Sequence, residues 1–204
     1  MLKIWGEHRS LDAQKVMWLV NELEFDYSYT PFDDELEGLN DSSSFAISQN
    51  ERVPVLNDNG LVVWGAHTIL RYLAALYRSS LLYPEDDRDC PEAWMNWTKA
   101  EFQPDFQMSF FWEGSRQSSN KKNCLLFRES MSRCTRHVQL LDRALDGREF
   151  LGGEKFTLAD VHVGTVIYRY LELDIERPSV PNVEAWYRRL QDRPAYREHV
   201  MIQS

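Results

Sequence analysis

Residues 52–73, RVPVLNDNGLVVWGAHTILRYL, constrain the fold of this chain more than any other stretch. Two short runs rich in valine and leucine flank the residues NDNG, and an asparagine–glycine pair between such runs is a strong signal for an antiparallel hairpin. In the segment HTILRYLAALY that follows, apolar residues recur at helical spacing. The stretch therefore predicts strand, turn, strand and helix, with WGAH at the corner before the helix. Such a corner exposes backbone N–H groups that suit an anion, yet Gly65 and Ala66 have no polar side chain.

The sequence before this stretch predicts a β-α-β order. Residues 2–5, LKIW, are expected to form a strand, and residues 13–25, AQKVMWLVNELEF, have apolar side chains at helical spacing. Residues 26–33, DYSYTPFD, favour an extended strand that Pro31 ends or places at an edge. The acidic, serine-rich residues 33–44 are expected to form a loop. The first part of the chain is therefore predicted to run β-α-β and then β-β-α.

The composition of the sequence changes after Tyr77. Residues 78–92, RSSLLYPEDDRDCPE, hold two prolines and several acids, which is typical of a linker, and nearly everything after them favours helix. We predict an α/β domain with a mixed four-stranded sheet over residues 1–78, a linker over 79–90 and an all-helical domain over 91–204. Within the latter, FTLADV predicts a helix start with Thr157 as N-cap and Asp160 as its partner three residues later.

Composition excludes several classes of function. The 204 residues are 43% hydrophobic and include 7 tryptophans, which supports a large packed core, and no apolar run reaches the roughly 18 residues that a membrane span needs. The N-terminus has no features of a signal peptide, and the three cysteines form neither a CxxC motif nor a metal-type cluster, so we expect a cytoplasmic protein without a metal. The net charge of −9 argues against nucleic-acid binding.

The joint order of the motifs RS…QKV, RVPVL, ILRYL and FTLAD resembles the cytosolic glutathione transferases over essentially the whole chain, and it looks closest to their bacterial theta-like members. The resemblance implies a thioredoxin-like N-terminal domain followed by a helical bundle. It also implies a homodimeric transferase that uses glutathione as co-substrate and conjugates its thiol to small apolar electrophiles, without contact to nucleic acid or membrane.

The resemblance places Ser10 where these enzymes aim a serine hydroxyl at the glutathione sulfur. The thiolate is the nucleophile, and each unit by which a site lowers the thiol pKa from about 8.5 requires about 1.4 kcal/mol of thiolate stabilisation. A hydroxyl at a helix N-terminus supplies part of it. A structural role suits the residues equally well, because Ser10 or Asp12 can cap the first helix. Asp12 stands where relatives are expected to have asparagine, and a carboxylate near a thiolate is unfavourable.

Val53 and Pro54 offer a second contact. In this fold the peptide before Pro54 is expected to be cis, which leaves the backbone of Val53 free to pair with a peptide ligand; alternatively the cis bond only shapes the turn, and both readings can hold. Arg52 is the nearest basic candidate for the glycyl carboxylate of glutathione. The acidic run DDELEG at residues 33–38 does not help there and is explained by a solvated loop.

The corner at Gly65 and Ala66 departs from the family pattern. Relatives usually have an acidic residue or glutamine and then serine, which hold the γ-glutamyl end of glutathione, whereas here only backbone N–H groups remain. A hydrogen bond to a charged group contributes about 1.5–3 kcal/mol, so each lost contact weakens the affinity roughly ten- to a hundredfold. His67 is a candidate to compensate, although a histidine at a helix start is more often a solvated surface residue. Trp64 is expected to be packed.

The aromatic segment FQPDFQMSFFWEG at residues 102–114 and the later Tyr168 supply candidates for an apolar electrophile pocket. We select Phe106, Phe110 and Tyr168, although most aromatic side chains at helical spacing belong to a core. Glu101 and Asp105 are candidates for contact with a partner subunit.

Two functions of different classes follow. The first is a glutathione transferase whose affinity for glutathione is weakened. The alternative is a non-catalytic protein of the same fold that acts as a binding or regulatory module. The clustered departures at Asp12, Gly65 and Ala66 support it, together with Glu51, which stands where relatives commonly have glycine. Titration with glutathione discriminates between the two functions.

Overall fold

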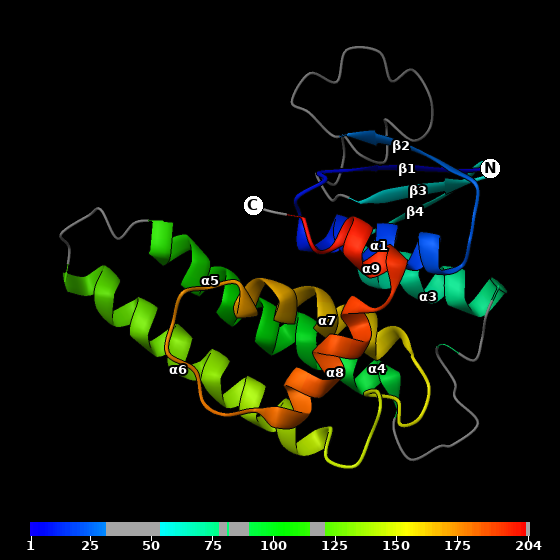
Figure 1. Ribbon diagram of the computed structural model, residues 1–204. Coiled ribbons are helices and arrows are strands. Elements are labelled where there is room, and N and C mark those ends of the chain that lie inside the picture. Colours follow the sequence, from blue (N-terminus) through cyan, green and yellow to red (C-terminus); the bar gives the residue numbers. More distant parts are fainter. Residues whose placement is uncertain (32–53, 78–80, 82–89, 115–120, 203–204) are drawn as a thin grey trace. The chain divides into compact units, whose positions relative to one another are not determined.

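A computed structural model of the chain describes residues 1–31, 54–77, 81, 90–114 and 121–202, except for the side chains of residues 109–114 and 121–124 (Figure 1). These residues form two compact units, one built from Met1–Leu82 together with Gln191–Ser204 and the other from Tyr83–Leu190. None of the described helices is long and apolar enough to cross a membrane.

The first unit contains the predicted four-stranded mixed sheet. Its strand order is β2-β1-β3-β4, with β1 parallel to β2 and antiparallel to β3, and β3 antiparallel to β4. The elements of this unit are β1 (Leu2–Gly6), α1 (Leu11–Glu22), β2 (Tyr27–Pro31), β3 (Val55–Asp58), β4 (Leu61–Trp64), α3 (Ala66–Tyr77) and α9 (Pro194–His199). The structure thus confirms the β-α-β, β-β-α order that the sequence predicts.

The β3–β4 hairpin turns as the NDNG signal predicts. Asn59 and Gly60 both have positive φ, 51° and 98°, which is the backbone that a two-residue type I′ turn requires. The Asp58 carboxylate accepts hydrogen bonds from the hydroxyl groups of Tyr72 and Tyr77 at 2.9 and 3.0 Å. Because both tyrosines lie on α3, these bonds tie the hairpin to the helix that follows it.

The end of the chain packs on α1. The ring of Tyr196 on α9 lies 4.6 Å from the ring of Trp18, which is fully buried. Arg193 forms an ion pair with Glu22, the last residue of α1. The sequence prediction placed residues 191–204 in the helical domain, whereas their contacts join them to the first unit. An amphipathic helix shows only that one face is buried, not which partner covers it.

The described part of the second unit is helical, as predicted. Its elements are α4 (Pro91–Trp97), the π-helical turn η2 (Thr98–Phe102), α5 (Gln103–Gly114), α6 (Lys121–Ala144), α7 (Leu158–Leu171) and α8 (Pro181–Gln191). Helix α7 is buried along almost its whole length, and α4 and α5 both pack against it.

The helix start predicted at FTLADV is present. Asp160 accepts hydrogen bonds beyond the one to the N-cap that the sequence predicts. Asp160 is fully buried and accepts the backbone N–H of Thr157 at 2.8 Å, its hydroxyl at 3.1 Å, the N–H of Leu151 at 2.9 Å and the indole N–H of Trp186 at 2.9 Å. Burial raises the pKa of Asp160, while these four donated bonds favour its ionised form. One carboxylate therefore joins α7, α8 and the loop before α7.

Candidate functional site

Three segments that the sequence singles out meet at one end of the sheet, where β1 and β4 end and β3 begins. A Cβ added to Gly6, the last residue of β1, would lie 3.2 Å from the Cβ of Ala13 on α1 and 3.4 Å from the Cβ of Pro54. The carbonyl of Pro54 in turn accepts the N–H of Gly65 at 2.9 Å. The start of α1, the proline before β3 and the corner before α3 are therefore neighbours, and glycine at position 6 permits their close approach.

Ser10 is the N-cap of α1. Its backbone is extended, with φ −72° and ψ 140°, and its Oγ accepts a hydrogen bond from the N–H of Ala13 at 3.1 Å. The structural role expected for Ser10 is thus confirmed. A hydroxyl that accepts in this way keeps its own proton for donation. Ser10 is half-buried, so the cap leaves its hydroxyl proton available to a second partner.

Asp12, one residue into α1, does not present an uncompensated charge. Its carboxylate forms an ion pair with the ammonium of Lys15 at 2.9 Å. Lys15 is only 1% exposed, so the pair holds a cation in the first turns of α1, close in sequence to Ser10. From the sequence, Asp12 is expected to be unfavourable for a thiolate, and the ion pair with Lys15 offsets this effect. The pattern of an acid three residues before a lysine on one helix face was the available signal.

The corner at Gly65 has an unusual backbone. Gly65 has φ +80°, a conformation that side-chain-bearing residues rarely adopt, and Ala66 is 3% exposed. Because the N–H of Gly65 is bonded to Pro54, it is not open to a ligand. The next backbone donor at this corner is the N–H of Ala66, the first residue of α3. Trp64 was expected to be packed; it is 42% exposed, so that expectation is wrong.

The remaining predicted residues separate into two groups. Arg52 and Val53, and the side chain of Phe110, lie outside what the structure describes. Phe106 on α5 and Tyr168 on α7 are each 4% exposed, and burial raises the pKa of the Tyr168 phenol. Both side chains therefore belong to the core of the second unit.

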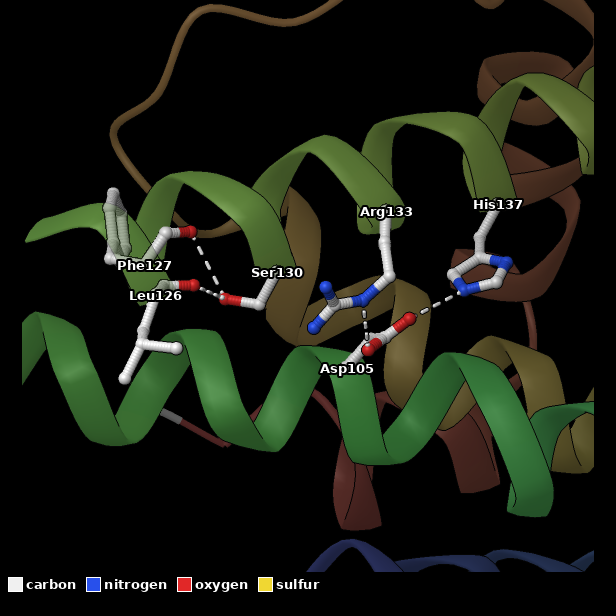
Figure 2. Close-up of polar contacts among 6 residues, drawn as sticks. All are labelled: Asp105, Leu126, Phe127, Ser130, Arg133 and His137. Carbon is white, nitrogen blue, oxygen red and sulfur yellow. Dashed lines mark hydrogen bonds and ion pairs between the residues drawn. The ribbon is translucent and has the colours of Figure 1, made fainter. Parts of the chain in front are cut away.

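Figure 2 shows a charged cluster that the sequence reading only partly anticipated. Asp105 on α5 accepts a hydrogen bond from Nε of Arg133 at 2.6 Å and lies 2.9 Å from Nε2 of His137, both of which are on α6. The ring of Trp97 covers His137 edge-on at 5.2 Å. Asp105 was a candidate for contact with a partner subunit; in the structure its carboxylate links two helices of its own unit.

Comparison with known proteins supports the resemblance. Residues 1–75 match the family model of the glutathione S-transferase N-terminal domain, and residues 107–194 match that of the C-terminal domain. Glutathione S-transferase GstB of Escherichia coli strain K12 is 28% identical, and the match covers 99% of each chain.

Two solved structures of a theta class glutathione S-transferase from the citrus canker pathogen Xanthomonas axonopodis pv. citri are also similar. The form with glutathione bound is 31% identical, with a TM-score of 0.84 over 99% of this chain and 98% of that one. The apo form is 30% identical, with a TM-score of 0.81 over 99% of this chain and 97% of the other. With both family models and an end-to-end relative above 30% identity, the chain belongs to the cytosolic glutathione S-transferase family and is a glutathione transferase enzyme.

Proposed function

We propose that the protein conjugates the glutathione thiol to small apolar electrophiles, with Ser10 stabilising the thiolate. The thiol proton leaves to solvent, the Ser10 hydroxyl donates a hydrogen bond to the sulfur anion, and the sulfur forms a bond to the electrophilic carbon as the leaving group departs with its electron pair. The protein need not provide a covalent nucleophile of its own. Its part is to bind glutathione and to favour the thiolate over the thiol.

The observation that carries this proposal is the position of Ser10 at the N-terminus of α1. The positive end of the helix favours an anion there, and the bond from Ala13 fixes the Oγ without using its proton. The buried Lys15 keeps Asp12 from opposing a nearby negative charge. A charge-assisted bond from a hydroxyl contributes about 1.5–3 kcal/mol, which corresponds to lowering the thiol pKa by about one to two units.

We further propose that glutathione is bound in an extended form at this end of the sheet, with weakened affinity. The backbone of Val53 beside Pro54 pairs with the peptide, Arg52 meets the glycyl carboxylate, and the first turn of α3 at Gly65 and Ala66 receives the γ-glutamyl end. The weakening follows from two features of this corner. Neither residue brings a polar side chain, and the N–H of Gly65 is already bonded to Pro54.

The electrophile requires an apolar wall, for which we propose Phe106, Phe110 and Tyr168. Phe106 and Tyr168 are each 4% exposed. Most of each side chain therefore packs in the core, and we propose that the small exposed part contacts the electrophile. The family relationship further supports a cytoplasmic location, a homodimer and a site without a metal, and we include all three in the proposal.

Calorimetric titration with glutathione tests this proposal. We expect weak but measurable binding to the wild type and about tenfold tighter binding to Ala66→Ser, because the new hydroxyl lies at the first turn of α3 without strain. Gly65→Glu is the less suitable variant, because glutamate must adopt the positive φ of Gly65.

The matched control is Ala74→Ser on the same helix, which changes the same groups at another buried alanine and should leave the affinity unchanged. Tight binding to the wild type would remove the claim of weakened affinity. Absence of binding to both the wild type and Ala66→Ser would overturn the proposed glutathione site at this corner.

A further inference from the structure

Helices α1 and α9 lie antiparallel, and two contacts fix their register (Figure 1). Arg193 pairs with Glu22 at the end of α1. Tyr196 packs on Trp18, which lies one turn closer to the start of α1 than Glu22. With 3.6 residues per turn, the next pair in this register lies three or four residues further along each helix. The C-terminal end of α9 therefore meets the first turns of α1, at Gln14.

Three buried polar atoms lie at this end of the helix pair. Gln14 is 1% exposed, and neither its side-chain oxygen nor its nitrogen has a hydrogen-bond partner among the residues that the structure describes. Nε2 of His199, the last residue of α9, also has no hydrogen-bond partner among the described residues. His199 is 6% exposed, and the nearest Glu198 oxygen lies 3.7 Å from its Nε2. Buried amide and imidazole groups of this kind normally have partners, because leaving them unpaired is unfavourable.

The loop that carries Ser10 borders the same place. The backbone N–H of Gln14 donates to the carbonyl of Ser10 at 3.0 Å, the first hydrogen bond of α1. His8, two residues before Ser10, is close enough to His199 for its charge to help lower the pKa of that imidazole, after burial as the main cause. On its other side, the ring of His8 packs edge-on against Tyr29 at 5.9 Å. His199 thus faces the loop from α9 while Tyr29 faces it from β2.

We propose that Gln14 and His199 together bind one buried water molecule, and that through it α9 holds the first turn of α1 with Ser10 at its N-cap. Buried waters typically make about three hydrogen bonds to polar groups that otherwise have none, and the two side chains offer three such atoms. The neutral imidazole accepts a hydrogen bond from the water, and the glutamine can both donate and accept. Gln14 and His199 are positioning residues in this account.

The water site itself does not depend on glutathione, whereas its effect on catalysis rests on the proposed function of Ser10. Gln14→Met tests the site, because methionine has a similar shape without the amide. If the amide were merely tolerated, removing it would leave stability unchanged or improved. If it binds water together with His199, we expect a loss of stability, and at least tenfold faster hydrogen exchange at the amides of Ala13 and Gln14. Met17→Leu, a change at a buried apolar residue of the same helix, is the control.

His199→Phe should reproduce the faster exchange, and His199→Gln, which keeps polar atoms on the side chain, should restore part of the protection. In the transferase assay with glutathione, we expect Gln14→Met and His199→Phe to lower kcat severalfold with little change in KM, because they disturb the position of Ser10. A Gln14→Met protein as stable as the wild type, with unchanged exchange at Ala13, would overturn the proposal. If the wild type forms no thiolate, the proposed function fails while the exchange result still decides the water site.

Discussion

Arg193, just before α9, donates hydrogen bonds to both carboxylate oxygens of Glu22, a residue 171 positions earlier in the chain. The indole N–H of Trp18 donates to the same carboxylate at 3.2 Å. The side chains of Arg193 and Glu22 are 26% and 17% exposed, so the pair is largely shielded from solvent. These contacts fasten the end of the chain to the helix that carries Ser10.

We predict that Arg193→Met lowers the free energy of unfolding by about 1–3 kcal/mol, because it leaves the shielded carboxylate of Glu22 with the indole as its main donor. Urea denaturation measures this change. Arg188→Met is the matched control, since Arg188 pairs with Glu184 at 3.7 Å in an exposed position and should change stability by only a few tenths of a kcal/mol. Equal effects of the two substitutions would contradict the structural importance of the Glu22 contact.

Asp160→Asn should be among the most damaging substitutions in the second unit. Asparagine keeps one acceptor oxygen, but its NH₂ group replaces the other oxygen. That group cannot accept the hydrogen bonds that backbone N–H groups and the indole N–H donate to the carboxylate. We expect a loss of about 3–5 kcal/mol in the free energy of unfolding, as for other buried networks that lose a charged partner. Thermal and chemical denaturation would show it. Asp142→Asn is a milder comparison because that carboxylate is only partly buried; a loss at Asp160 no larger than at Asp142 would count against the network.

Side chains at position 65 should destabilise the protein in the order of their tolerance for positive φ. With φ at +80°, asparagine is accommodated better than alanine, and alanine better than valine. The loss for alanine should be about 1–2 kcal/mol. An added Cβ meets nothing within 4 Å among the residues that the structure describes, so the loss reflects the backbone conformation. Melting temperatures of the three variants test the order. If Gly65→Ala proved as stable as the wild type, the strain argument would be wrong.

The stability of the protein should depend on His199 below neutral pH. Burial, with a contribution from the charge of His8, lowers the pKa of His199 below 6.5, while Glu198 opposes the shift. As the pH falls below 6.5, the unfolded chain binds a proton that the folded protein resists, so the free energy of unfolding decreases until the folded-state pKa is reached. His199→Leu should remove this part of the pH dependence.

Comparing urea midpoints at about pH 7.5 and about pH 5 for the wild type and for His199→Leu measures this effect. Because the charge of His8 contributes to the lowered pKa of His199, His8→Leu should reduce this pH dependence without removing it. An identical decrease between the two pH values in the wild type and in His199→Leu would contradict the assignment.

Local patterns predicted the elements that local forces determine. The hairpin follows from the positive φ that Asn59 and Gly60 tolerate, and the start of α7 follows from its N-cap pattern at Thr157. The same local reasoning named Ser10 and Asp12 as candidate caps of α1, and the structure has Ser10 as the N-cap. The chemical role of Ser10 toward the glutathione sulfur follows from the resemblance to the family. The geometry of the N-cap is compatible with that role.

Contacts between distant segments could not be predicted in this way. Nothing near Glu22 in the sequence indicates that Arg193 is its partner, and the burial of Lys15 and Gln14 depends on elements far along the chain. The use of the Gly65 N–H by Pro54 was also invisible, because it arises only once the hairpin and α3 are folded.

Stabilisation of the glutathione thiolate by Ser10 is measured by the thiol pKa of bound glutathione, followed through the ultraviolet absorbance of the thiolate. Ser10→Gly is the appropriate variant, because glycine at an N-cap costs only a few tenths of a kcal/mol in helix stability while removing the hydroxyl. We expect a wild-type pKa about one to two units below the value of about 8.5 for a free thiol, and a return toward that value in Ser10→Gly. An identical pKa in the two proteins, at saturating glutathione, would contradict it.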